Sequence, residues 1–122
     1  MESANVELSK EENQKIIDQM RAHQAERKAA TVAAQPALIR LMAVAERDTG
    51  QSRVIAKFLL GCYNGNRFPF DLTDFRVLDH ALFNDCMLVL SMDSYCTQEI
   101  HCYFENGGQR FEKLADDWNL NK

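Results

Sequence analysis

Apolar positions along most of the chain recur at spacings of three and four residues, the period of one face of an α-helix. No alternation of apolar and polar residues, as a half-buried strand would show, persists for more than a few positions. The pattern therefore predicts an all-α protein, in which a long N-terminal helical arm precedes a compact bundle of four or five short helices.

The predicted arm begins with a capping box, in which Ser9 and Glu12 satisfy backbone amides of the first helical turn. We expect residues 1–8, which precede this cap, to be frayed and disordered. From Lys10 to about Ala34 nearly every residue favours helix, and neither Gly nor Pro occurs. A single long helix is the structure that this stretch predicts.

The apolar face of this helix is thin. Ile16, Ile17 and Met20 form a short patch, and mostly alanine follows it. A helix with so little to bury gains little stability by packing on its own chain. We therefore interpret it as an arm that lies on a neighbouring molecule or pairs with a copy of itself; a partly melted extension is the alternative. The contact candidates on the arm are Ile16, Ile17, Met20 and Arg27.

Aromatic residues separate the arm from the rest of the chain. All eleven lie between Phe58 and Trp118, and residues 1–57 contain none. Aromatic side chains dominate the area that a core buries. We therefore predict two parts, an N-terminal arm over residues 1–50 and a compact domain over residues 51–122.

Glycine, proline and capping residues set the expected helix boundaries. Pro36 is expected to interrupt the N-terminal helix or to open the next one, and Gly50 to end it. Ser52 is expected to cap the first helix of the compact domain, Asp71 or Thr73 to cap a short second helix, and Asp79 to start a longer third one. The expected helices span residues 52–65, 72–78, 79–92, about 97–107 with Gly107 as its stop, and 109–120. The inward face of the third helix is expected to comprise Leu82, Phe83, Cys86, Val89 and Leu90.

One segment near the C-terminus allows two interpretations. Ile100 and Phe104 lie four residues apart, as on a helix, whereas Tyr95, Thr97, His101 and Tyr103 fit one face of a strand. The helix is the prediction and the strand is the alternative. The last helix is clearer, because Phe111, Leu114, Ala115 and Trp118 form one apolar stripe.

Composition and charge narrow the class of protein. The apolar fraction of 46% and the charged fraction of 26% are typical of a soluble globular domain. The net charge is −4 and neither half of the chain is basic, so nucleic acid is not favoured as a partner. We expect no secretory signal and no membrane span. The four cysteines are expected to be free thiols in the cytoplasm.

Three stretches between residues 55 and 120 carry a resemblance to a known family: LLGCYNGNRFPFDLTDFRVLD, CMLVLSMD and EIHCYFENGGQRFEKLADDWNL. They resemble a family of small uncharacterised proteobacterial proteins that are often carried on plasmids, integrated elements and phage-like regions. The family has no assigned activity, so the resemblance implies no functional residue. It implies a context, that of a bacterial, cytoplasmic accessory protein carried on mobile DNA.

Patterns for catalysis, cofactors and metals are weak. Cys96, His101 and Cys102 lie close together, but the paired spacings of structural zinc sites are missing. A cysteine nucleophile needs a thiol of lowered pKa, and these cysteines mostly have apolar neighbours. The predicted helices 72–78 and 79–92 have the shape of a helix-turn-helix, yet the second offers no arginine or lysine to read bases. We expect no enzyme, no cofactor and no metal.

The stretch YNGNRFPFDLT, residues 63–73, is a candidate binding element. Pro69 keeps the chain extended, so that Phe68 and Phe70 project to opposite sides. Either both are buried, or one is an exposed anchor beside Arg67, and arginine and aromatic side chains contribute much of the energy of interfaces. The further candidates are Asp116 and Asp117, which lie near a helix C-terminus, where negative charge is unfavourable unless it is solvated or meets a basic partner.

These patterns predict a small non-enzymatic interaction protein. It would be an accessory or inhibitor protein of a bacterial mobile element that binds another protein or forms a homodimer through its N-terminal helix. A host defence or regulatory component is one candidate target. The alternative is a nucleic-acid-binding transcriptional regulator that uses the basic residues of that helix.

Overall fold

The computed structural model describes residues 9–95 and 97–121, and every regular element among them is helical. The predicted all-α fold is confirmed. The expected disorder of residues 1–8 lies outside the described residues. The elements in chain order are α1 (Lys10–Ala45), α2 (Gly50–Tyr63), the 3-10 helix η2 (Leu72–Val77), α3 (His80–Tyr95), the 3-10 helix η3 (Ile100–Tyr103) and α4 (Gly107–Asp117).

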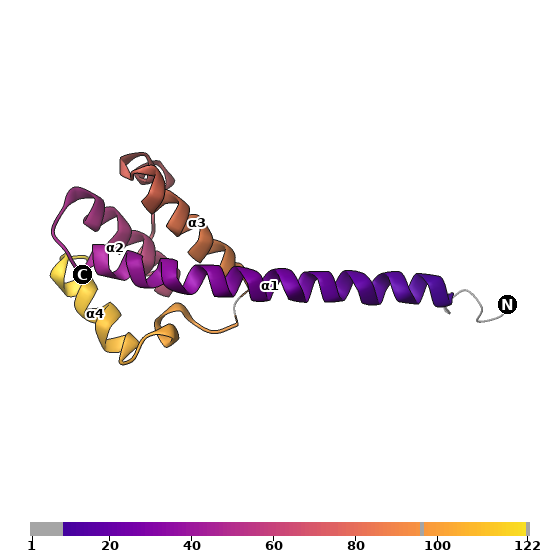
Figure 1. Cartoon of the computed structure of the whole chain (residues 1–122). Helices are drawn as coiled ribbons and strands as arrows, with labels where there is room; N and C mark the ends of the chain where they lie inside the picture. Colours follow the sequence, from indigo (N-terminus) through magenta and orange to yellow (C-terminus); the bar gives the residue numbers. More distant parts are fainter. Residues whose placement is uncertain (1–8, 96, 122) are drawn as a thin grey trace.

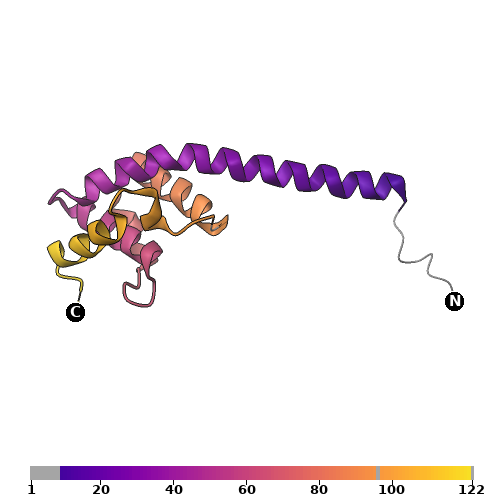
Figure 2. The ribbon, with the colours of Figure 1, turned by 90° about the horizontal axis from the view of Figure 1, so that it is seen from below.

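Helix α1 is the organising element of the fold. Its N-terminal end extends far beyond the other helices, which gather around its C-terminal end (Figure 1). Figure 2, turned by 90°, shows most of this body on one side of α1. The structure is thus a projecting helix with a small helical body attached to one face of its last turns.

The first turn of α1 has the predicted cap, because the backbone amide of Glu12 donates to the Ser9 Oγ at 3.1 Å. The expected break at Pro36 is wrong, since the helix continues through it to Ala45. Proline removes the amide that would bond to the carbonyl of Val32. Both residues lie on the exposed side of α1, where water can hydrate that carbonyl.

The last three turns of α1 are part of the core. Six of their residues are at most 1% exposed: Ala34, Ala37, Leu38, Leu41, Met42 and Ala45. Burial therefore begins well before residue 51, where the compact domain was expected to begin. The distribution of aromatic residues did not indicate this part of the core, because α1 contributes only aliphatic side chains to it. These side chains pack on α2 and α3.

The junction between α1 and α2 differs from the expectation. Gly50 does not end the first helix but is the first residue of α2, and Ser52 is not its cap. Thr49 caps α2 instead, because its Oγ1 accepts the Ser52 amide at 3.0 Å. Ser52 itself is buried and shares a hydrogen bond of 2.8 Å with the Thr49 hydroxyl.

Aspartate caps start the next two helices, as predicted. The Asp71 carboxylate accepts the Thr73 amide at 2.9 Å, and the Asp79 carboxylate accepts the Leu82 amide at 2.8 Å. The first of these helices is the short 3-10 helix η2. Leu90 of α3 was expected to face inward but is 44% exposed. The buried residues of α3 are Cys86, Val89 and Met92.

The C-terminal segment covers the other side of the core. The predicted helix near residue 100 is present only as η3, and α4 begins at Gly107, which was expected to be a stop. Phe111 is fully buried, as the stripe on this helix predicted. The half-buried Trp118 donates its Nε1 hydrogen to the Ala45 carbonyl at 2.9 Å, which ties the end of α4 to the end of α1.

Candidate interaction surfaces

The projecting part of α1, residues 10–33, is exposed apart from the half-buried Ala30 and Thr31. At 1.5 Å per residue, this part is about 36 Å long. In proteins most of the stability of a helix comes from packing of an apolar face and not from helix propensity. The body leaves nearly all of the projecting part uncovered, so its side chains are available for contact.

The arm candidates lie on the face of α1 that continues the core face. Ile16 and Ala34 are 18 residues apart, and so are Met20 and Leu38, which corresponds to five full turns. Ile16 and Met20 are 42% and 58% exposed, because the body ends before it reaches them. Ile17, on the same patch, is also 42% exposed. These residues remain contact candidates, on the side of α1 that faces the body.

The candidate Arg27 already has a neighbour. Its guanidinium group lies over the ring of Tyr95, at the end of α3, with 5.5 Å between Cζ and the ring centroid. This is the range of a cation–π interaction. Arg27 thus marks the point along α1 where the body ends.

A second apolar face of α1 points away from the body and was missed in the sequence. We call it the outward stripe, and its seven exposed residues are Ala22, Ala25, Ala29, Val32, Pro36, Ile39 and Ala43. Its two largest exposed side chains are Val32 at 71% and Ile39 at 64%. The sequence does contain the pattern of a helical face, since the spacings between these residues alternate between three and four. The face was missed because its alanines were interpreted as a lack of apolar surface.

The outward stripe lies opposite the core face. Val32 and the buried Leu41 are nine residues apart, or two and a half turns. Figure 2 shows most of the body on one side of α1 and the other side open. α1 therefore has an apolar stripe on each of two opposite sides, of which the body covers only one.

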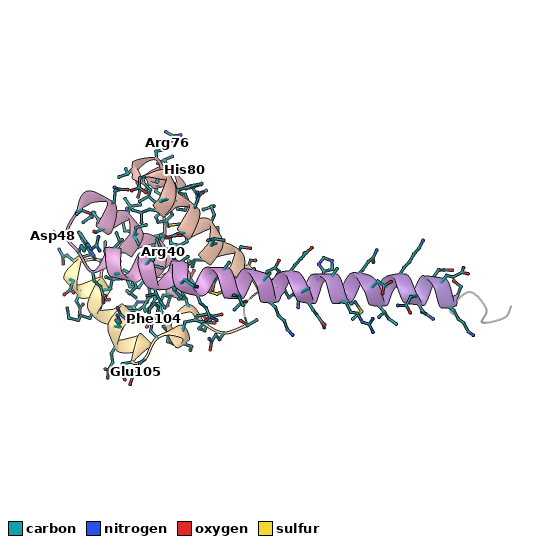
Figure 3. The ribbon with its side chains drawn as sticks, viewed as in Figure 1. Arg40, Asp48, Arg76, His80, Phe104 and Glu105 are labelled. Atoms are coloured by element: carbon teal, nitrogen blue, oxygen red, sulfur yellow. The ribbon has the colours of Figure 1, made fainter. Side chains whose placement is uncertain are left out.

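An ion pair flanks the outward stripe. Arg40, which Figure 3 shows on the body-bearing part of α1, donates two hydrogen bonds of 2.9 and 3.0 Å to the Asp85 carboxylate of α3. The hydrogen bonds and the charge of Asp85 raise the pKa of Arg40 above its ordinary value. An open hollow of about 840 Å³ lies beside this pair, between α1 and the start of α3.

The Phe-Pro-Phe turn is packed against the body. Phe68 is only 6% exposed, and Phe70 is half-buried, with its ring 5.9 Å from Phe58 and 4.8 Å from Phe75 between centroids. The guanidinium group of Arg67 covers the ring of Phe68, at 4.6 Å from its centroid. Neither phenylalanine is a free-standing exposed anchor.

Arg67 is engaged within the chain. It donates hydrogen bonds of 2.7 and 2.9 Å to the two oxygens of Glu112 on α4, and the Tyr63 hydroxyl donates to the same carboxylate at 2.6 Å. These donors, Arg67 first, lower the pKa of Glu112 to about 2 from its ordinary 4.5. The cluster ties the turn to α4.

Glu112 should therefore stabilise the fold in a pH-dependent way. A carboxyl of lowered pKa adds stability above its unfolded-state pKa and loses it as pH falls toward its folded-state pKa. We expect Glu112→Gln to reduce the free energy of unfolding by about 1 kcal/mol at neutral pH, a value discounted because the pair is partly solvated. Urea denaturation should show this difference above about pH 4.5 and its disappearance near pH 2.

Glu105→Gln is the control for this prediction, since Glu105 is exposed and Figure 3 shows it at the edge of the body. It should leave stability unchanged at every pH. A Glu112→Gln variant that matches wild type at neutral pH would contradict the role of the cluster.

The two acidic candidates at the end of α4 are exposed. Asp117 pairs with Lys113 one turn earlier at 2.7 Å, and Asp116 accepts a hydrogen bond of 3.2 Å from the Asn121 side chain. Both carboxylates are solvated and remain candidates for contact with a basic partner.

The cysteine candidates do not form a reactive site among the described residues. Burial raises the pKa of the Cys62 and Cys86 thiols to about 12, which disfavours the thiolate that nucleophilic attack or metal binding needs. Cys102 is exposed, with its Sγ 3.7 Å from the Nε2 of His101. No group of three potential ligands gathers within the described part of the chain, and Cys96 lies outside it.

Charge on the projecting helix is nearly balanced. Residues 10–33 contain five basic and four acidic side chains, so they form no basic stripe of the kind that phosphate backbones attract. Among the described helices, none contains an apolar stretch of the length that a membrane span requires.

Sequence comparison adds one decisive match. The family model of DUF7673, a family of unknown function, matches residues 35–119. The chain belongs to this family. The match begins beside Ala34, where burial begins on α1, and therefore covers the packed body of this DUF7673 protein but not its projecting helix. Searches of the curated proteins and of the solved structures find no match.

Proposed function

We propose that this DUF7673 protein is a non-enzymatic interaction protein that self-associates through the outward stripe of α1. The observation that supports this proposal is the second apolar face of α1. Apolar residues that alternate at spacings of three and four are what a helix presents to a partner helix in a coiled coil. Since the body occupies the opposite face, a second copy can approach α1 without displacing it.

An antiparallel arrangement fits the stripe. Placing Val32 of one copy opposite Pro36 of the second copy also places Ala29 opposite Ile39. The larger side chains thus meet smaller or flatter ones, as close helix packing requires. The two bodies would lie at opposite ends and on the outer sides of the helix pair.

Charge favours the same register. This antiparallel register brings Glu26 of one copy close to Arg40 of the second copy. The contact occurs twice because the arrangement is symmetric. Arg40 is 56% exposed despite its bond to Asp85, so its guanidinium group retains room for a second carboxylate. Opposite charges that flank an apolar seam select partner and orientation in coiled coils.

The cellular context is part of the proposal. The resemblance noted in the sequence implies a bacterial, cytoplasmic accessory protein carried on a mobile element, and an interaction protein suits that setting. Its support is the resemblance alone.

Substitution of the stripe tests the proposed self-association. We expect Val32→Glu with Ile39→Glu to weaken the dimer at least about 100-fold, because each change removes roughly 1.5 kcal/mol or more of apolar burial and introduces like charges across the seam. Sedimentation velocity over a range of protein concentrations measures this shift. Both residues are exposed, so each protomer should stay folded by circular dichroism.

The matched control is the double variant Ile16→Glu with Met20→Glu, whose residues lie on the opposite face of the same helix and are exposed. It should leave the dimer intact. Loss of the dimer in this control and not in the stripe variant would transfer the interface to the arm candidates and overturn the proposal. Binding to duplex DNA that collapses between low and physiological salt would favour the regulator alternative.

A further inference from the structure

An open pocket of about 300 Å³ lies between the Phe-Pro-Phe turn, α2, η2 and α3. Four phenylalanines line it: Phe58, Phe68, Phe70 and Phe75. Leu72 and Leu90 also line it and are 74% and 44% exposed, so apolar surface continues from the pocket to its rim. This pocket lies on the body and is separate from the outward stripe.

One wall of this pocket carries a carboxylate without a partner. Asp93 of α3 lines the pocket, and no described residue donates a hydrogen bond to its side chain or forms an ion pair with it. Partial burial, and then the charge of Glu99, raise the pKa of Asp93 above its ordinary value. A half-buried carboxylate that pays for desolvation without a cation is unusual for a side chain that only maintains the fold.

We propose that this pocket binds an arginine side chain of a partner protein. A guanidinium group stacks on aromatic rings and forms paired hydrogen bonds with a carboxylate, and the pocket offers both kinds of surface side by side. Lysine has a more strongly hydrated charge and gains less from stacking. The apolar rim at Leu72 and Leu90 suits the aliphatic residues that neighbour this arginine in the partner.

The pocket also explains the stretch FPF in the sequence. Pro69 separates two rings that line the same pocket, so the turn builds a pocket wall instead of presenting one phenylalanine to solvent. Arg67 does not fill the pocket, because it is bonded to Glu112.

A pair of tripeptides tests this site on the full chain. The probe is N-acetyl-Leu-Arg-Leu-amide, and its control contains citrulline, the neutral isostere of arginine, at the central position. We expect the arginine peptide to shift backbone amide resonances of Gly61, Gly65 and Leu72 in ¹⁵N-labelled protein at millimolar concentration. The citrulline peptide should bind about fivefold more weakly, as for loss of a partly exposed ion pair.

Asp93→Asn should reduce the affinity for the arginine peptide to that for the citrulline peptide, while Asp48→Asn, an exposed carboxylate before α2, should change neither. Equal binding of both peptides to wild type, or arginine binding that persists in Asp93→Asn, would overturn the proposal, as would shifts that do not map to the pocket. The result is independent of self-association, since none of the pocket residues belongs to α1.

Discussion

Replacing Gly107 with alanine is expected to destabilise the fold by about 3 kcal/mol or more. Gly107 is buried at the start of α4, where η3 turns back against it. A Cβ atom at this position would lie 1.7 Å from the carbonyl oxygen of His101 and 2.7 Å from its carbon. These are backbone atoms, so no side-chain rotation relieves the overlap, and α4 would have to separate from η3.

The adjacent Gly108→Ala provides the matched control. Its Cβ would meet no atom closer than 3.9 Å, the His101 side chain, and alanine favours helix over glycine. We expect Gly108→Ala to be neutral or slightly stabilising in guanidinium denaturation. Similar midpoints for the two variants would refute the packing of η3 against α4.

The second large effect is expected at Leu41 of α1. Leu41→Ala should lower the free energy of unfolding by about 2–5 kcal/mol, because the residue is fully buried and its loss leaves a cavity. Ile17→Ala, on the projecting part of the same helix, should change it by less than about 0.5 kcal/mol. Both variants need the same protein concentration, since self-association couples stability to concentration.

This comparison tests whether α1 belongs to the body. A loss below about 0.5 kcal/mol for Leu41→Ala would mean that the last turns of α1 do not contribute to the core. A large loss for Ile17→Ala would instead show that the projecting part is packed in solution.

The sequence was sufficient for features that depend on neighbouring residues. The capping side chains of Ser9, Asp71 and Asp79 act within three residues of their own position, and the apolar stripe of α4 shows its helical period directly. The all-α class followed from the same local periods.

Glycine and proline misled the prediction where their role depends on the fold. Pro36 is tolerated because its position in α1 faces solvent, which only the placement of the body reveals. Gly107 is required by the approach of a residue in another element and not by a helix end. The start of the core was expected too late, because aromatic residues were used to mark it and α1 buries none.

The candidate sites also differ in whether they depend on neighbouring residues or on the fold. The pocket proposed to bind arginine joins Phe58, Phe75 and Asp93 from three elements, so no local spacing predicts it. The outward stripe was readable in principle from its alternating spacings. It was overlooked because four of its seven residues are alanine, whose apolar surface is small.

The mass of the full chain in solution, measured by light scattering across a range of protein concentrations, tests the central claim most directly. The account predicts a mass that approaches twice the 14.0 kDa of a single chain as concentration rises. A mass of 14.0 kDa at every concentration would contradict self-association through the outward face of α1.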